Sequence, residues 1–212
     1  NAVYNELPKP EGKQPQFDDM HIPYWGLGLS IGAAFYESLD AIDFMRQNMT
    51  AAKLPFDSIL HGIDYMNQFQ SWTVNDCKYK CYAANKFNCV ADDLQDYISK
   101  LHDQGFRYQI HIDPSVPTDD PNYTHYNDYM DTSFISDSYG AKYNGKYWAV
   151  NPANIQEGQC NGNPFDMSIK SDVAYWDFLG VQGREDWIYC IADFKNRLLN
   201  FDGVFASGFG IQ

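Results

Sequence analysis

Positive charge is scarce in this sequence. Its 212 residues include 15 Lys and Arg against 28 Asp and Glu, a net charge of -13, and no run of basic residues interrupts this balance. Such a chain repels phosphate backbones, so we predict that it does not bind nucleic acid. An acidic surface of this kind mostly serves solubility.

Long apolar segments and a signal-like start are also missing. The most apolar uncharged segment, 22–36, carries a proline and three glycines and is shorter than the roughly 20 residues that cross a bilayer. We interpret it as a buried strand. No basic and then apolar segment follows Asn1, which leaves two alternatives: a signal segment has been removed, or the start lies inside a longer protein.

The chain has five cysteines, of which Cys77, Cys81 and Cys89 lie close together while Cys160 and Cys190 lie far downstream. A zinc ribbon needs two paired Cys or His clusters, and none accompanies this C-x3-C spacing, so we predict no metal site. Disulfides are the better interpretation. The odd count means that one thiol is free or has its partner outside these residues.

Two glycosylation sequons point to the secretory route. They are Asn48-Met49-Thr50 and Asn122-Tyr123-Thr124, which make Asn48 and Asn122 candidate glycosylation sites. Together with the cysteines they favour a secreted, lumenal or extracellular protein, and attachment to a membrane outside these residues stays open.

The composition, 44% hydrophobic and 20% charged, is that of a globular domain with one sizeable core. Residues 1–21 are rich in Pro, Gln, Lys and Asp without a hydrophobic period, so we predict an approach segment or linker there. The folded domain is expected at 22–212, as one domain or part of one.

Hydrophobic periods alternate between strand and helix over the first half of this domain. In the helix expected after Ser38, the side chains of Leu39, Ile42, Met45 and Met49 face the core, and that of Phe44 points away from it. The order β-α-β-α-β predicts parallel strands with crossover helices. The expected elements are a strand at 24–31, a helix from the N-cap Ser38 to about Ala52, a strand at 57–64, a helix at 91–103 closed by Gly105, and a strand at 107–113.

The regular alternation lapses after residue 114. Residues 139–150 predict a β-hairpin that turns at Asn144-Gly145, and 172–200 predict a helix broken near Gly180 and Gly183. A closing strand is expected at 203–207. This α/β pattern is typical either of a doubly wound sheet or of the first half of a (β/α)8 barrel.

Catalytic and binding side chains in such folds lie at the carboxyl ends of the strands. Alternation places Asp64 and Asp113 on matching faces of neighbouring strands, so we expect them to converge at one rim. His61 and His111 are out of phase, and we interpret them as structural histidines rather than metal ligands. Glycines 26, 28 and 32 have the wrong spacing for a dinucleotide site, and no cofactor is predicted.

Several motifs occur in a characteristic order. They are "PYWGLGLSIGAAFYESLDAIDFMRQNMTAAKLPFDSILHGIDYMNQFQSWTVND", "LHDQGFRYQIHIDPSV", "GKYWAV" and "FDGVFAS", over about residues 22–207. This chain resembles the start of the catalytic barrel of glycoside hydrolase family 31, the α-glucosidases and sucrase-isomaltase relatives. "GKYWAV" is similar to the family's G-x-V-W-P-G, and "FDGVFAS" aligns with F-D-G-x-W-I-D. The resemblance implies strands 1–4 of a TIM barrel with a β-hairpin insertion after the third.

The family resemblance implies a retaining mechanism with two carboxyl groups about 5–5.5 Å apart. The family's nucleophilic aspartate aligns with Ser207. An uncharged hydroxyl cannot stabilise an oxocarbenium-like centre as a carboxylate does, nor readily form and release a glycosyl intermediate. Gly62 stands where the family has an aspartate that grips the sugar. The acid/base residue of the family lies beyond residue 212. Together these departures imply an inactive homologue.

We therefore predict a family-31-like domain without hydrolytic activity, part of a larger polypeptide or assembly, that serves as a carbohydrate-binding or structural module. Asp64, Asp113 and Trp148 are the candidate contacts to α-linked glucosides or glycans, although acids also cap helices and Trp148 also suits a core. The alternatives are an active retaining α-glucosidase and a structural glycoprotein subunit that binds no sugar. A serine hydrolase is disfavoured, because Phe205 and Phe209 occupy the glycine positions of G-x-S-x-G.

Overall fold

The computed structural model describes residues 23–33, 35–36, 38–67, 70–81, 90–118, 133–135, 144–149 and 169–206. Of Cys77, 144–149 and 169–171 the backbone alone is described. The predicted approach segment 1–21 lies outside these ranges. Among the helices within them, none combines the length and the apolar character that crossing a membrane requires.

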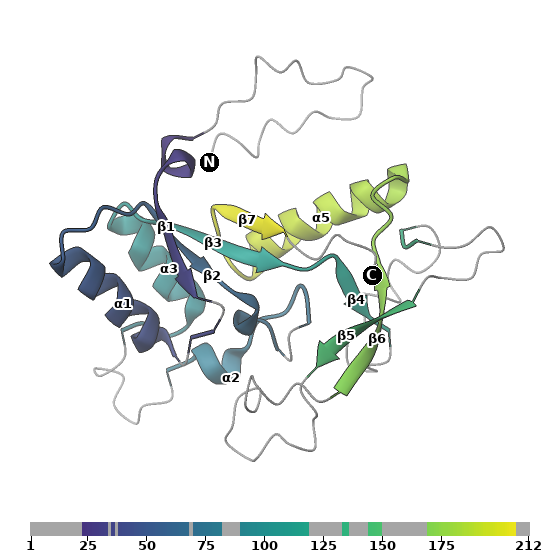
Figure 1. Cartoon of the computed structure of the whole chain (residues 1–212), viewed down its shortest axis with the longest axis horizontal. Helices are drawn as coiled ribbons and strands as arrows, with labels where there is room; N and C mark the ends of the chain where they lie inside the picture. Colours follow the sequence, from purple (N-terminus) through teal and green to yellow (C-terminus); the bar gives the residue numbers. More distant parts are fainter. Residues whose placement is uncertain are drawn as a thin grey trace.

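Four parallel strands form the central sheet (Figure 1). They are β1 (Ser30–Ala33), β2 (Ser58–His61), β3 (Arg107–Ile112) and β7 (Gly203–Ala206), in the spatial order β1-β2-β3-β7. The spatial order follows the chain without reversal, which is typical of a (β/α)8 barrel, whereas a doubly wound sheet reverses direction at a switch point. The α/β fold class is confirmed; the described residues supply four strands of such a barrel and do not close it.

A second, antiparallel sheet follows β3. It consists of β4 (Ser115–Pro117), β6 (Ile169–Tyr175) and β5 (Asn144–Ala149), with β6 in the middle. β4 begins two residues after Asp113, at the carboxyl end of β3. The small sheet therefore lies on the side of the barrel where the candidate site is expected.

The helices have clear sequence origins. α1 (Leu39–Ala51) is capped by Ser38, whose hydroxyl accepts a hydrogen bond from Ala41 N at 3.2 Å. α3 (Leu94–Asp103) is capped by Asp93 and ends at Gly105, which has a φ of 86°. There Gly105 N donates to His102 O, and the next residue's N–H donates to Leu101 O, which is a Schellman motif. The remaining helices are α2 (Asp76–Tyr79) and α5 (Val181–Arg197), with short 3-10 turns η2 (Tyr24–Leu27) and η3 (Ile63–Tyr65).

One face of the parallel sheet is buried under the helices. Tyr108, Ile110 and Ile112 of β3 are fully buried, while the alternating Gln109 and His111 are partly exposed. The helical partners of this core include Leu39 and Ile42 of α1, Ile98 and Leu101 of α3, and Phe194 of α5. Each fully buried aliphatic side chain contributes about 1.5–3 kcal/mol. As predicted, Met45 and Met49 pack against this core, and Phe44 is 68% exposed.

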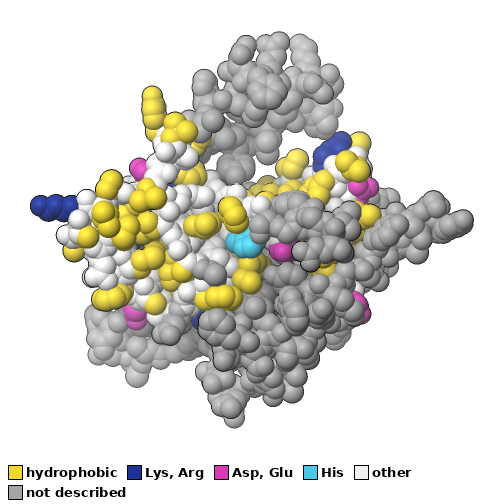
Figure 2. Space-filling model, viewed as in Figure 1, with side chains coloured by type: hydrophobic (Ala, Val, Ile, Leu, Met, Phe, Trp, Pro, Cys, Tyr) yellow, Lys and Arg dark blue, Asp and Glu magenta, His cyan; other side chains and the backbone are white. Residues whose placement is uncertain are grey.

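The opposite face of the sheet corresponds to the inside of a barrel. Gln109 Nε2 donates to Ser30 Oγ at 2.8 Å and to Ser58 Oγ at 2.7 Å, so a polar cluster joins three strands there. Phe205 of β7 is 51% exposed. Figure 2 shows hydrophobic side chains over the visible face of the molecule with a histidine among them.

Three predicted elements differ from the structure in part or in whole. Residues 24–27 are a 3-10 turn after Pro23, and the strand starts at Ser30. Asn144-Gly145 is no hairpin turn: both residues lie in β5 and pair with Ala174 and Val173 of β6, because sheet pairing overrides the local turn preference.

The predicted helix at 172–200 starts later than expected. Residues 172–175 belong to β6, and α5 begins at Val181. Asp177 Oδ1 accepts hydrogen bonds from Leu179 N and Gly180 N, both at 3.0 Å, which fixes the turn before the helix. Gly183 does not break α5. It permits close packing, because a Cβ there would lie 2.3 Å from Asp177 O.

Candidate functional site at the carboxyl ends of the strands

The carboxyl ends of β2 and β3 lie side by side. Register pairs Leu60 with Gln109 and the last residue of β2, His61, with Ile110. Asp64 follows β2 in η3, and Asp113 follows β3 directly. Tyr65 Oη, next to Asp64, donates to His111 O at 2.8 Å and ties the two strand ends together.

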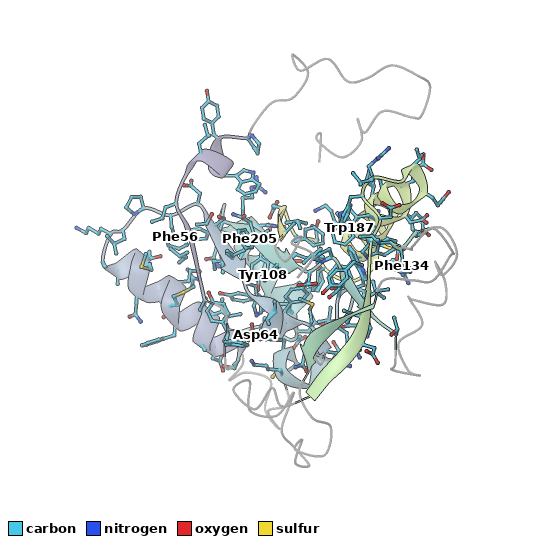
Figure 3. All side chains as sticks on the ribbon, turned by 45° about the vertical axis from the view of Figure 1, so that its right-hand side comes forward. Phe56, Asp64, Tyr108, Phe134, Trp187 and Phe205 are labelled. Carbon is cyan, nitrogen blue, oxygen red and sulfur yellow. The ribbon has the colours of Figure 1, made fainter. Side chains whose placement is uncertain are left out.

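Asp64 is enclosed by protein groups and is 1% exposed (Figure 3). Its Oδ2 accepts hydrogen bonds from Tyr36 N at 2.7 Å, Tyr79 Oη at 2.6 Å and Lys78 Nζ at 2.8 Å. Its Oδ1 lies 3.1 Å from His61 Nε2. Burial by itself would raise the pKa of Asp64, but the hydrogen bonds from His61, Lys78 and Tyr79 lower it to about 2.

His61 is fully buried beside this carboxylate. Its Nδ1 accepts from Tyr108 Oη, and its Nε2 lies 3.0 Å from Tyr79 Oη. We assign the Nε2–H tautomer from these partners and from Asp64 Oδ1. Burial, opposed by Asp64, lowers the pKa of His61, so the ring is neutral near pH 7. His61 has a structural role, as the sequence predicted.

Asp64 and Asp113 both lie at the rim where they were predicted, but Asp64 does not follow the strand alternation on which the prediction rested. Both acids lie at the carboxyl ends of adjacent strands, but β2 ends at His61 and the chain turns into η3. Strand alternation therefore does not extend to Asp64, which turns into the buried core with His61 and Tyr79.

Asp113 differs from Asp64 in its hydrogen bonds. One of its carboxylate oxygens accepts no hydrogen bond from a described residue. Its Oδ1 accepts from Ser115 N at 2.9 Å and from Ser115 Oγ at 2.5 Å, and no described residue donates to Oδ2. The side chain is 9% exposed. Burial raises the pKa of Asp113 despite the hydrogen bonds from Ser115. Within the described strand ends, Asp113 is thus the acid able to accept a further hydrogen bond from a ligand.

His111 stands on the inner face between Asp113 and β7. Its ring contacts Phe205 edge to face, with centroids 5.6 Å apart. Burial, opposed by the charge of Asp113, lowers the pKa of His111 and leaves it neutral near pH 7. Among the described residues no cluster of three or more His, Cys, Asp or Glu could hold a metal ion.

Comparison with known proteins identifies the family. The model of the glycosyl hydrolases family 31 TIM-barrel domain matches residues 20–207. The chain belongs to glycoside hydrolase family 31. The match runs through all four parallel strands, from β1 to the end of β7.

Curated relatives within family 31 are much longer than this chain. It is 26% identical over 201 residues to an uncharacterised family 31 glucosidase of Schizosaccharomyces pombe, covering 86% of the chain and 19% of that protein. It is 25% identical over 210 residues to intestinal sucrase-isomaltase of Suncus murinus, covering 93% and 11%. It is 27% identical over 166 residues to lysosomal alpha-glucosidase of Mus musculus, and the match covers 73% of this chain and 16% of that protein. The chain thus spans less than a fifth of these relatives.

Solved family 31 structures share the fold. A family 31 alpha-glucosidase from Bacteroides thetaiotaomicron superposes with a TM-score of 0.55 at 20% identity, covering 88% of this chain and 26% of that one. An ER glucosidase II heterodimer, of a catalytic subunit and the binding domain of a regulatory subunit, superposes with a TM-score of 0.53 at 15% identity. The match covers 84% of this chain and 16% of that one. At these identities the likeness concerns the fold alone.

Several residues predicted from the family pattern fall on less described parts. Ser207 and Asn122 lie outside the described residues. Trp148 lies in β5 opposite Lys170, with only its backbone described. Asn48 is exposed near the end of α1. The roles of these residues stay predictions.

The sequence reasoning missed the groups that hold Asp64. Lys78 and Tyr79 lie in α2, which was not predicted, although Asn75 is a recognisable N-cap whose side chain accepts from Lys78 N at 3.1 Å. The signal in the sequence was an Asn-Asp pair at the start of the helix, followed closely by an aromatic residue. Four residues are too few to produce a helical period.

Proposed function

We propose that this family 31 domain binds α-linked glucosides without hydrolysing them. The observation that carries the proposal is the serine at position 207, the position of the family's nucleophilic aspartate. Support for this alignment comes from β7, which pairs in parallel with β3 through Gln109–Ile112 and ends at Ala206, directly before Ser207.

The chemistry explains why this one residue matters. Retaining glycosidases form a covalent glycosyl-enzyme intermediate with a carboxylate, which also stabilises the positive charge that develops at the anomeric carbon. A serine hydroxyl is neutral at pH 7 and needs a neighbouring base before it can attack. Gly62 removes a second carboxylate from the same rim. Two lost acids leave a site that can hold a sugar but has little means of cleaving it.

We assign the ligand contacts to Asp113, Trp148 and Asp64 in different ways. Asp113 has a carboxylate oxygen to which no described residue donates, so it suits a sugar hydroxyl. Trp148 would offer an aromatic face to a sugar ring. Asp64 is enclosed by Lys78, Tyr79 and Tyr36, so it would act by fixing the rim unless Lys78 moves aside.

We infer that the protein is lumenal or extracellular and functions within a larger polypeptide or assembly. The relatives include a lysosomal and an ER enzyme, and the ER glucosidase II subunit forms a heterodimer with a regulatory subunit. Asn48 of the first sequon is exposed, as a glycan acceptor must be, and Cys81 is disulfide-bonded. Glycosidase digestion followed by mass spectrometry tests Asn48 and Asn122.

Calorimetry with maltose and isomaltose on the full-length protein tests the binding half of the proposal. We expect measurable heat of binding with the unmodified protein. In Asp113→Asn the affinity should fall at least about tenfold, because one strong hydrogen bond to a charged group contributes about 1.5–3 kcal/mol. The matched control is Asp103→Asn, an exposed acid at the end of α3. No heat with either sugar would favour a structural subunit, and glucose release would favour an active α-glucosidase.

A further inference from the structure

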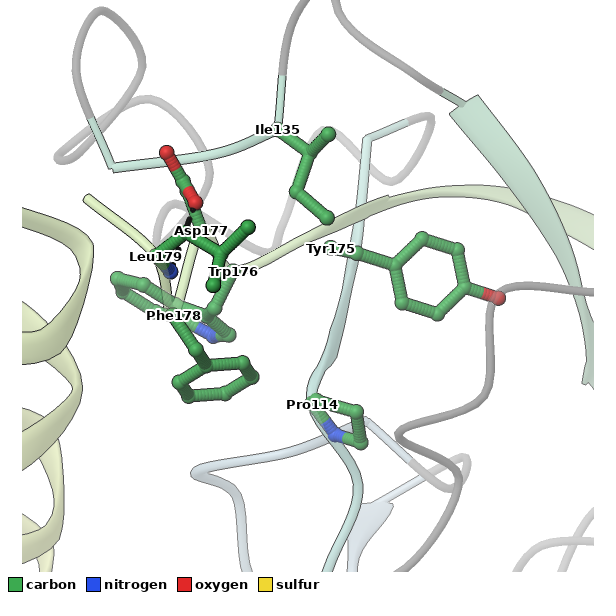
Figure 4. A pocket seen from close by; sticks show the side chains of 7 residues that line it. All are labelled: Pro114, Ile135, Tyr175, Trp176, Asp177, Phe178 and Leu179. Carbon is green, nitrogen blue, oxygen red and sulfur yellow. Dashed lines mark hydrogen bonds between the residues drawn. The ribbon is translucent and has the colours of Figure 1, made fainter.

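One exposed aromatic side chain lies on the same helix as a glycosylation sequon. Phe44 of α1 is 68% exposed, and the sequon Asn48-Met49-Thr50 begins one helical turn later. Other exposed apolar side chains have different surroundings: Leu179, for example, is 94% exposed beside a cavity of about 270 Å³ (Figure 4). Among the described residues with large, exposed apolar side chains, Phe44 is the one whose helix carries a sequon.

Phe44 and Asn48 lie next to each other on the outer face of α1. Ile42 and Met49 contact the core from the opposite face, while Phe44 and Asn48 are both exposed. Residues four positions apart in a helix are neighbours, with Cβ atoms about 5–6 Å apart. Helical side chains lean toward the helix N-terminus and cover the preceding turn. A group attached to Asn48 Nδ2 is therefore directed over the ring of Phe44.

The polar side chains that precede Asn48 are held at a carboxylate. Arg46 Nε donates to Asp43 Oδ1 at 2.7 Å, and Gln47 Nε2 donates to Asp43 Oδ2 at 2.5 Å. Asp43 is buried, so both side chains are drawn toward the core side of the helix rather than over Phe44. No described residue forms a hydrogen bond with the side-chain amide of Asn48. This amide is therefore accessible, and the ring of Phe44 beside it is uncovered.

A sugar on Asn48 would meet Phe44 without a separate binding step. Because the sugar is tethered one helical turn away, the contact costs none of the translational freedom that a free ligand loses on binding. An N-acetylglucosamine ring carries C–H groups on its faces, and an aromatic ring offers them an apolar surface. The sugar is also uncharged, so the net charge of -13 does not oppose the contact.

We propose that Asn48 carries an N-linked glycan whose first N-acetylglucosamine packs on the ring of Phe44 and stabilises α1. The proposal rests on the proposed lumenal or extracellular location, because the glycan donor, a lipid-linked pyrophosphate oligosaccharide, belongs to the secretory route. In the transfer, Asn48 Nδ2 bonds to C1 of the sugar and loses one proton, while the C1–O bond to the pyrophosphate breaks with its electron pair. α1 leads from the end of β1 back toward the start of β2, so Asn48 lies away from the candidate sugar site.

Hydrogen exchange, measured by mass spectrometry on the full-length protein secreted from cells that make high-mannose glycans, tests the contact. The unmodified protein, Asn48→Gln, Phe44→Ser and the double variant are compared as a cycle. We expect the glycan to slow exchange of the α1 amides about threefold to tenfold when Phe44 is present, and less than about twofold in Phe44→Ser. Trimming the glycan to its first N-acetylglucosamine should keep the effect, because only that sugar touches the ring. Leu54→Ser, at a 50% exposed position just after α1, is the matched control and should leave the effect of the glycan unchanged.

The outcomes separate the contact from the location and from carbohydrate binding. A glycan on Asn48 that slows exchange equally with and without Phe44 would overturn the contact and leave the lumenal or extracellular location standing. A glycan on Asn122 with none on Asn48 would do the same. If neither asparagine carries a glycan, the contact and the location both fail. Calorimetry with maltose on Asn48→Gln should match the unmodified protein in every case, so failure of carbohydrate binding is measured separately.

Discussion

Replacing Asp64 by asparagine probes the buried network that fixes the end of β2. A pKa lowered from 3.8 to about 2 corresponds to about 2–3 kcal/mol of stabilisation of the folded state. Asparagine removes the ion pair to Lys78, whose side chain is 15% exposed, and leaves that ammonium group without its carboxylate. We therefore expect Asp64→Asn to lose about 2–4 kcal/mol of unfolding free energy at pH 7.

The lowered pKa of Asp64 also determines how the stability of the protein depends on pH. Because the folded-state pKa of Asp64 is lowered, its stabilising contribution is present above about pH 4 and is lost as the pH falls through about 2. Urea unfolding followed by tryptophan fluorescence should show the difference between wild type and Asp64→Asn shrinking across this window. Asp76→Asn, which removes an exposed ion pair to Lys80 in the same short helix, is the control and should change stability by about 0.5 kcal/mol or less.

Two results would refute this reasoning. One is a stability loss in Asp64→Asn no larger than that in Asp76→Asn at pH 7, which would mean that the buried hydrogen bonds contribute nothing net. The other is a large loss that stays constant down to pH 2, which would assign the effect to packing rather than to the charge of Asp64.

Three further predictions concern the sheet, a helix end and the missing chemistry. Asp202 Oδ2 accepts from His102 Nε2 at 2.6 Å and from Tyr108 N at 2.9 Å, so Asp202→Ala should cost about 1–3 kcal/mol and speed hydrogen exchange of the Tyr108 amide at least about tenfold; unchanged exchange would contradict this. Gly105→Ala should lose about 1–2 kcal/mol in urea unfolding, because its φ of 86° is strained for alanine although a Cβ would meet no atom within 4 Å; an unchanged midpoint would argue against this origin. Ser207→Asp alone should release no nitrophenol from nitrophenyl α-glucoside, because Gly62 still lacks the second carboxylate; measurable turnover would disprove it.

Much of the parallel sheet could be predicted because its signals are local. Ser38 begins α1 and Gly105 follows α3 through side-chain and backbone preferences that act within a few residues. The alternation at 107–113 reports a strand buried on one face, and β3 has that burial pattern. The family motifs then indicated which α/β fold these elements form.

The insertion after β3 could not be predicted because its structure depends on distant partners. Asn144-Gly145 has the composition of a tight turn, yet it pairs with Ala174 and Val173, almost thirty residues away in sequence. Residues 172–175 lie in β6 and not in the helix predicted over 172–200. The break comes from Asp177, whose carboxylate caps a turn that no periodicity reveals.

The candidate site was predictable in place but not in detail. The rule that functional residues follow parallel strands selected Asp64 and Asp113 correctly as strand-end acids. Their different environments follow from tertiary contacts: Lys78 and Tyr79 reach Asp64 from α2, while Ser115 is the described residue that donates to the carboxylate of Asp113.

The most direct test of the account is a hydrolysis assay on the purified full-length protein with nitrophenyl α-glucoside and maltose, run beside calorimetry on the same preparation. The account predicts binding of the glucoside and no release of nitrophenol or glucose above the uncatalysed rate. Turnover that an α-glucosidase inhibitor abolishes would contradict it, because the proposed alignment puts Ser207 at the nucleophile position and leaves no carboxylate there.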